Sequence, residues 1–267
     1  MYQSHWGLRE NPFRTRLDPR FFYESPTHEE ALARLHFLVE AERRLGLLLG
    51  ESGSGKSLVL EVFAAQMRRA GRPVAKANLL GVEPEEMLWL LCAGFGVNPD
   101  RGLGAAPLWR MLADRIAEYR YQRLAAVVLL DDADHAAGDV LRHVARLAQL
   151  ESAGDARLTL VLACRPERIA RLGSSLLELA DLRIDLEPWQ PEDTGNFLKS
   201  SLAQAGREEP VFAEDAVVRL HELAHGVPRR VTQLADLALA AGAGGHLDAV
   251  DAETVEAVYH ELGTVSV

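Results

Sequence analysis

The chain has 267 residues, enough for one full α/β core and a small appended domain. Its 48% apolar and 25% charged content is typical of a soluble globular protein. No apolar run reaches the roughly 18 residues that cross a bilayer, and the first six residues lack a basic-then-apolar leader. We therefore expect a cytoplasmic location and no transmembrane segment. A net charge of −10 disfavours a surface that binds nucleic acid over a broad area, but it leaves room for a local one.

The two cysteines give no sign of a disulfide framework or of a Cys-based zinc site. Cys92 and Cys164 lie far apart in the chain, and neither has a second cysteine nearby. Residues 1–26 show no regular period but contain NPF at 11–13 and an aromatic cluster at 21–23, so we expect this segment to be fixed by its aromatic side chains.

A helix is predicted after this segment. Thr27 is a suitable N-cap, and Glu30 three residues later completes a capping box. The apolar residues then recur at helical spacing, which predicts a buried face made of Ala31, Leu32, Leu35, Leu38 and Val39.

The next stretch, 45–57, reads LGLLLGESGSGKS: a short apolar strand, a glycine-rich turn, and then lysine and serine. It matches G-x-x-x-x-G-K-[ST], the pattern of a loop that wraps nucleotide phosphates. Gly50, Gly53 and Gly55 allow φ > 0, so that successive N–H groups can point at an anion beside a helix N-terminus. Lys56 would contact the β and γ phosphates, and the Ser57 hydroxyl would bind Mg²⁺. The residues expected to contact the nucleotide are Gly50, Glu51, Ser52, Gly53, Ser54, Gly55, Lys56, Ser57 and Leu58.

The alternative for this stretch is a flexible Gly/Ser turn that fits by accident. The chain has only three lysines, so a chance match is on the order of one in a thousand for this length. Apolar residues at helical spacing also follow the loop directly, as the phosphate-loop interpretation requires.

Further strands and helices alternate along the chain after this loop. Strands are predicted at 73–79, 125–130, 158–163 and 182–186, and helices at 84–93 and 108–123. Residues 94–107 are interpreted as a plain connector rather than a partner-binding loop. From Pro188 the strands cease, and four helices are predicted at 191–205, 213–225, 228–241 and 251–262.

The alternation predicts an α/β fold with a mostly parallel five-stranded sheet and helices on both of its faces. We expect two domains: 1–187, which holds the N-terminal segment and the nucleotide-binding α/β core, and 188–267, a small all-α lid.

An acidic pair follows the apolar run 125–130. Asp131 and Asp132 open the sequence DDAD at the carboxyl end of a predicted strand. A carboxylate there can hold Mg²⁺, and its neighbour can orient or deprotonate the attacking water. We assign the metal to Asp131, together with Ser57, and the water to Asp132. The alternative is that DDAD caps the following helix, which it can also do.

These motifs together resemble the AAA+ P-loop ATPases. The segments GLRENPF, DPRFFYESPTHEEALARL, GESGSGKS, LLDDAD and GVPRRVTQLADLAL resemble, in that order, the ATPase domain of the general secretion pathway protein A (ExeA-type) family. The likeness extends to the related transposition-helper and origin-recognition ATPases and covers nearly the whole chain. It implies an ATP-binding, Mg²⁺-dependent ATPase.

The resemblance also implies roles for individual residues. His28, with Pro26 and Glu29, falls in the segment near adenine. Asn78 matches a polar residue that couples the γ-phosphate to the catalytic acid, with strand capping as the alternative. Arg165 lies where a polar sensor follows the fourth strand.

Two further arginines match positions at which the family carries a cation. Such cations are needed because the γ-phosphate requires cationic donors during transfer. Arg229, in the GVPRR segment, matches the second sensor of the lid, and Arg230 competes with it. Arg183 is a candidate arginine finger for a neighbouring subunit, or else a surface residue.

The chain departs from the family at one catalytic position, because Asp132 stands where the family usually has glutamate. Its carboxylate is set back by about one C–C bond, roughly 1.5 Å. A misplacement of that size can cost about 10²-fold in rate. We therefore carry two hypotheses. One is an ATPase that couples hydrolysis to conformational change or assembly in secretion or envelope machinery. The other is a slowly hydrolysing, nucleotide-switched adaptor that recruits DNA or protein. By analogy, we expect ATP-dependent homo-oligomers and a protein partner within a larger assembly.

One motif is rejected. The stretch 221–225 fits H-E-x-x-H, which on a helix sets two imidazoles on one face for zinc. Gly226 and Pro228 end that helix at once, and no third ligand follows at the expected spacing. We interpret His221 and His225 as histidines on the surface of a lid helix.

Overall fold

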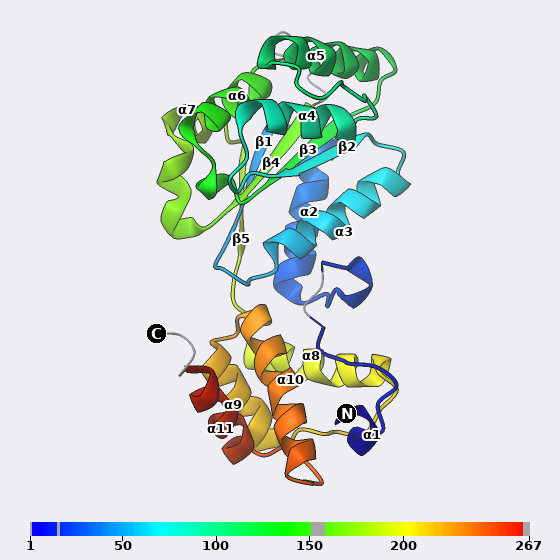
Figure 1. Ribbon diagram of the computed structural model, residues 1–267, viewed down its shortest axis with the longest axis vertical. Helices are drawn as coiled ribbons and strands as arrows, with labels where there is room; N and C mark the ends of the chain where they lie inside the picture. Colours follow the sequence, from blue (N-terminus) through cyan, green and yellow to red (C-terminus); the bar gives the residue numbers. More distant parts are fainter. Residues whose placement is uncertain (1, 15–16, 151–157, 264–267) are drawn as a thin grey trace. The chain divides into compact units, whose positions relative to one another are not determined.

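The computed structural model describes residues 2–14, 17–150 and 158–263 (Figure 1). Contacts group these residues into two compact units. The α/β unit consists of the described residues of 28–52 and 56–186. The helical unit consists of those of 1–27, 53–55 and 187–267. The N-terminal segment thus packs with the C-terminal helices, and the domain boundary between 187 and 188 stays a prediction.

The α/β unit is built on a five-stranded parallel sheet of order β2-β3-β4-β1-β5. Its strands are β1 Leu45–Gly50, β2 Val74–Asn78, β3 Ala126–Asp131, β4 Leu158–Cys164 and β5 Leu182–Leu186. Every residue of β1, β3 and β4 is buried, because these strands lie inside the sheet with helices on both faces. The edge strands β2 and β5 also carry exposed residues. The predicted strands and their parallel arrangement are confirmed.

The strand register brings the predicted site residues to one edge of the sheet. Asn78 at the end of β2 is paired with Asp131 at the end of β3. On the other side of β3, strand β4 ends at Cys164, whose partner on β1 is Leu49. The carboxyl ends of β3, β4 and β1 therefore lie side by side, because neighbouring strands are about 4.8 Å apart. The acidic turn, Arg165 and the phosphate loop each follow one of these strand ends.

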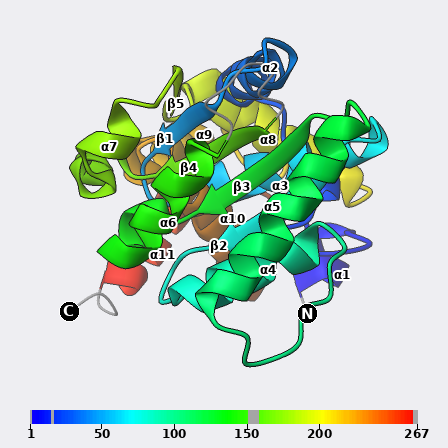
Figure 2. The same cartoon turned by 90° about the horizontal axis from the view of Figure 1, so that it is seen from above.

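Helices cover both faces of this sheet. The helical segments of this part of the chain are α2 Pro26–Glu40, α3 Lys56–Arg69, α4 Pro84–Gly94, α5 Ala105–Tyr121, η2 Ala133–His135, α6 Gly138–Ala148, η3 Pro166–Leu172 and α7 Ser174–Leu177. One core joins alternate strand residues to α4, α5 and α6, and the views show α2 and α3 on the opposite face (Figures 1 and 2). The helices predicted after β1 and β2 are confirmed.

Three details of the sequence interpretation need correction. Helix α2 begins at Pro26, so Thr27 is not its N-cap and the capping-box prediction is wrong. Proline fits the first turn, where its missing N–H leaves no donor unpaired. The Thr27 hydroxyl instead accepts a hydrogen bond of 3.2 Å from the Glu187 N–H. Helix α5 starts at Ala105, inside the predicted connector, and the prediction assigned neither α6 nor α7.

The helical unit contains α1 Tyr2–Trp6, η1 Pro19–Phe21, α8 Pro191–Gln204, α9 Glu214–Ala224, α10 Pro228–Gly244 and α11 Ala252–Gly263. The predicted C-terminal helices are confirmed. Aromatic residues fix the N-terminal segment, as expected: Trp6 and Phe13 are 1% and 3% exposed. The Trp6 indole N–H donates to the Leu239 carbonyl at 2.8 Å, and the Tyr23 ring packs edge-on against Trp189.

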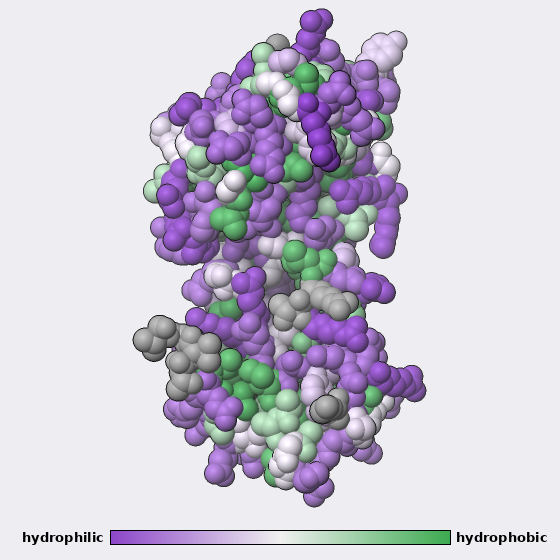
Figure 3. Space-filling view, in the orientation of Figure 1, coloured by the Kyte–Doolittle hydropathy of each residue, from purple (hydrophilic) through white to green (hydrophobic). Residues whose placement is uncertain are grey.

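The surface carries few large apolar side chains. Those in the described part of the chain are Leu17, Phe37, Leu80, Tyr121, Val218, Leu237 and Tyr259. Hydrophilic residues dominate the face in view, with a smaller apolar area on the helical unit (Figure 3). Among the described helices, none combines the length and apolarity needed to cross a membrane.

Candidate nucleotide-binding site

The loop between β1 and α3 has the backbone that a phosphate-binding loop requires. Gly53 and Gly55 have φ of +88° and +99°, a region that favours glycine. The expectation of φ > 0 at Gly50 is wrong, because Gly50 is the last residue of strand β1. Helix α3 begins at Lys56, so its unpaired N–H groups and positive dipole end face the loop. This strand, turn and helix start fit the phosphates of a nucleotide.

Lys56 is the buried cation of this site. Its side chain is tucked under the loop, with the residue 8% exposed, and Nζ donates to the carbonyls of Gly50 at 2.7 Å and Glu51 at 2.9 Å. Burial lowers the pKa of Lys56, and the nearby carboxylates of Asp131 and Asp132 act in the opposite direction. The ammonium therefore faces acidic residues across the carboxyl edge. A Mg²⁺-bound triphosphate has the charge pattern that fits between such groups.

The acidic turn after β3 is held in an unusual conformation. Asp131 is 3% exposed, and its Oδ1 accepts the Asp132 N–H at 3.0 Å. Asp132 has φ 51° and ψ 38°, the left-handed region that non-glycine residues seldom occupy. The Asp132 side chain makes no capping hydrogen bond to the 3₁₀ segment that follows, so it does not play the alternative role of a helix cap. The 3₁₀ segment η2 follows directly.

Asn78 joins this turn from the neighbouring strand. Its Nδ2 donates to Asp132 Oδ2 at 2.7 Å, while its Oδ1 accepts the Leu80 N–H at 2.8 Å. The amide is therefore oriented by its own backbone turn and fixes one carboxylate oxygen of Asp132. The structure thus brings together Asn78 and Asp132, which the sequence interpretation had associated through the family resemblance.

Arg165 approaches the same turn from β4. Its Nε donates to Asp134 Oδ2 at 3.1 Å, and its Nη2 lies 2.7 Å from Nε2 of His135. Asp134 is 1% exposed, so its charge is compensated by this guanidinium. The sequence interpretation named Arg165 but neither Asp134 nor His135. Their place in DDADH was the available signal, but the pairing depends on β3 and β4 being neighbours.

Arg183 lies apart from these contacts. Its guanidinium binds Asp185 on the same strand through Nε at 2.9 and 3.0 Å and through Nη2 at 2.8 Å. The Arg183 side chain is 59% exposed. Both of its interpretations, a finger for another subunit or a surface residue, are compatible with this position.

Arg229 and Gly53 meet within the helical unit. The Arg229 N–H donates to the Gly53 carbonyl at 3.1 Å, and a Cβ on Gly53 would lie 2.8 Å from Arg229 Cβ. Glycine at position 53 is therefore needed for its backbone conformation and for this close approach. Arg229 and Arg230 are both exposed, while His28, on α2, is 3% exposed. Their proposed contacts with nucleotide stay predictions.

The H-E-x-x-H stretch does not form a continuous helical face. Helix α9 ends at Ala224, one residue before the predicted end at 225, and His225 has φ 53°. The His221 Nδ1 lies 2.9 Å from the Thr194 hydroxyl, and burial lowers the pKa of His221. Within the ranges that the structure describes, no group of three or more His, Cys, Asp and Glu side chains could hold a metal ion.

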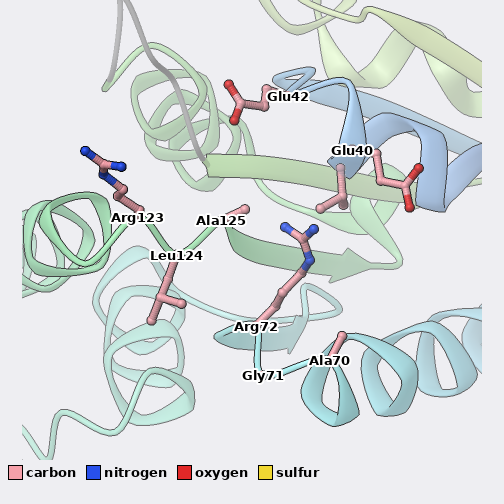
Figure 4. A pocket seen from close by; sticks show the side chains of 9 residues that line it. Glu40, Glu42, Ala70, Gly71, Arg72, Arg123, Leu124 and Ala125 are labelled. Atoms are coloured by element: carbon pink, nitrogen blue, oxygen red, sulfur yellow. The ribbon is translucent and has the colours of Figure 1, made fainter.

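A hollow of about 330 Å³ lies at the end of the sheet where the strands begin, opposite the phosphate loop (Figure 4). Helices α2, α3 and α5 end there, with Glu42, Gly71 and Arg123 in the left-handed region that closes many helices. Arg72 points into the hollow, where a cation offsets the negative ends of the three helix dipoles. The strands begin at this edge, so the hollow is separate from the phosphate loop.

The fold and the phosphate loop define a P-loop nucleotide-binding protein of the AAA+ type. The AAA domain family matches residues 39–172, half of the chain, and the chain belongs to that family. The match includes β1, the phosphate loop, Asn78, the acidic turn and Arg165.

General secretion pathway protein A from Aeromonas hydrophila is 30% identical to this chain over 268 residues, which cover 98% of this chain and 49% of that protein. The chain thus spans about half the length of this relative. The resemblance to this family is confirmed.

Solved structures share the fold at low identity. The Aeropyrum pernix ORC1 protein in complex with DNA has a TM-score of 0.70 at 19% identity, with 96% of this chain and 69% of that chain covered. Drosophila ORC bound to DNA gives 0.71 at 18%, covering 98% and 65%. The Thermotoga maritima RuvB Holliday junction branch migration motor gives 0.61 at 14%, covering 95% and 74%. The AAA+ fold, a parallel sheet followed by helices, is thereby confirmed.

Proposed function

We propose that this protein binds ATP with Mg²⁺ and hydrolyses it, and that hydrolysis drives conformational change or assembly. The observation that carries the proposal is the carboxyl edge of the sheet. There the buried Lys56 ammonium under the phosphate loop faces the acidic turn, and Asn78 holds the Asp132 carboxylate. These are the parts that phosphoryl transfer to water requires: a phosphate cradle, a cation and a base.

Each residue has a distinct task in this proposal. Loop N–H groups and Lys56 bind the phosphates, while Ser57 and Asp131 would hold Mg²⁺. The ion, when bound, neutralises charge on the phosphate oxygens. Asp132 accepts a proton from the attacking water, or orients it, and Asn78 keeps its carboxylate in one position.

The arginines would supply cationic donors to the γ-phosphate. Arg165 and Arg229 act within one chain, and Arg183 acts on a neighbouring subunit of an ATP-dependent homo-oligomer. His28 contributes near adenine. The name of the Aeromonas hydrophila relative supports a partner in secretion or envelope machinery, although this chain spans only about half of that protein.

Steady-state phosphate release tests the proposal. Lys56→Ala should abolish most of the activity, because the loop loses its cation. Lys199→Ala is the matched control: Lys199 is an exposed lysine on α8 and should leave the rate unchanged. ATPase activity that is insensitive to Lys56→Ala would overturn the proposal.

A second function, a slowly hydrolysing adaptor, is favoured by the short carboxylate of Asp132. Structures of similar fold are described as bound to DNA, which makes duplex DNA the first partner to test. The adaptor should bind its partner more tightly with ATP than with ADP at the same salt concentration. Equal affinity for the partner with ATP and with ADP would exclude this function.

A further inference from the structure

The turn after β3 is attached to the strands on both of its sides. Asn78, at the end of β2, binds Asp132, and Arg165, after β4, binds Asp134 and His135. We propose that Asp134 and His135 are positioning residues: together they hold the Arg165 guanidinium and thereby fix the turn that presents Asp132. The inference rests on the proposed function only where it concerns catalysis, since the contacts themselves can be measured without nucleotide.

The Asp134 contact supplies the charge. The Asp134 side chain is 2% exposed and accepts from Arg165 Nε at 3.1 Å, whereas the exposed carboxylate of Glu167 lies farther off, at 3.7 Å. A buried carboxylate with a single guanidinium partner holds that partner strongly, because separation would leave an unpaired charge in a poorly solvated place. Arg165 is therefore fixed mainly by Asp134.

The His135 contact selects a protonation state. A guanidinium can only donate, so the 2.7 Å contact from Arg165 Nη2 requires Nε2 of His135 to accept. The imidazole must then be neutral, with its proton on Nδ1. Protonation would turn Nε2 into a donor and place two cations side by side, so it would break the contact.

Loss of the Arg165 contacts should change the position of Asp132, because the residues that Arg165 binds belong to the same turn. Asp132 is in the left-handed conformation, which persists only where the surroundings enforce it. Asn78 enforces it from one side and the Arg165 contacts from the other. Release of Arg165 should therefore lower the rate of the chemical step more than it weakens ATP binding.

Three variants of the full chain test the proposal: Asp134→Asn, His135→Gln and, as a control, Asp114→Asn, which removes an exposed partner of Arg110 on α5. We expect Asp134→Asn to lower kcat about tenfold with a less than threefold change in KM for ATP. His135→Gln, whose amide oxygen can still accept from Arg165, should keep its rate. An Asp134→Asn protein with the kcat of wild type would overturn the proposal.

Nitrogen-15 NMR of histidine side chains, without nucleotide, separates this proposal from the ATPase proposal. His135, assigned by its absence in His135→Gln, should show the Nδ1–H tautomer at pH 8. It should shift to the Nε2–H tautomer or to fast averaging in Arg165→Lys. The Nε2–H tautomer in the wild type would overturn the inference whether or not the protein hydrolyses ATP. A protein with the Nδ1–H tautomer and no ATPase activity would refute only the proposed function.

Discussion

Replacing Asp132 with glutamate should change catalysis and stability in opposite directions. The extra methylene extends the carboxylate by roughly 1.5 Å toward the space where the attacking water is expected. If the shorter aspartate limits the reaction, kcat should rise by up to about 10²-fold, the scale of loss that follows from misplacing a catalytic group.

The stability cost follows from the backbone and from one hydrogen bond. Position 132 has φ 51°, a conformation that aspartate tolerates better than glutamate does. The longer side chain also displaces the oxygen that now accepts from Asn78 at 2.7 Å. The two effects together should lower the free energy of unfolding by about 1 kcal/mol. The loss is small because Asn78 is exposed, so that water can replace its hydrogen bond. For a chain of this size, the melting temperature should fall by about 2–4 °C.

Phosphate release at saturating ATP and thermal denaturation measure the two effects separately. Asp132→Asn keeps the size of the side chain but removes the base, so it should lose most of the activity. Asp114→Glu adds a methylene at an exposed position of α5 and should change neither quantity. An Asp132→Glu protein that hydrolyses ATP no faster than wild type would show that the reach of the carboxylate is not what limits the rate.

Three further variants or probes test the packing. Leu48→Ala, at a fully buried position of β1, should lower the free energy of unfolding by about 2–5 kcal/mol in a denaturant titration. Trp6→Ala removes a buried ring and its bond to the Leu239 carbonyl, so it should cost about 3–5 kcal/mol, measured in the same way. Burial raises the pKa of Cys164 to about 12, so at pH 8 its thiol should stay protonated and react with a thiol reagent much more slowly in the native than in the unfolded protein, followed by mass spectrometry.

The sheet and the phosphate loop could be predicted because their signals are local. An unbroken apolar run predicts a strand that is buried on both faces, and β1, β3 and β4 are of that kind. The glycines of the loop need φ > 0, and Gly53 and Gly55 have it. The partner of Arg183 was equally open to prediction, since Asp185, two residues along a strand, lies on the same face.

What could not be predicted depends on which distant segments meet. The contact of Arg165 with Asp134 and His135 requires β3 and β4 to be neighbours, and the strand order is not contained in any short pattern. The packing of Trp6 against α10 joins residues more than 230 positions apart. The start of α2 was misplaced because Thr27 suits an N-cap as well as Pro26 suits the first turn.

The central claim is that Lys56 and Asp131 share one magnesium-bound triphosphate. Calorimetric titration with ATP, with and without Mg²⁺, tests it most directly on wild type, Asp131→Asn and Lys56→Ala. We predict that Mg²⁺ tightens wild-type binding at least about tenfold, that Asp131→Asn binds ATP but loses most of this gain, and that Lys56→Ala binds weakly in both conditions. A wild-type protein that shows no heat of ATP binding, or Mg²⁺-dependent binding that both variants retain, would contradict the claim.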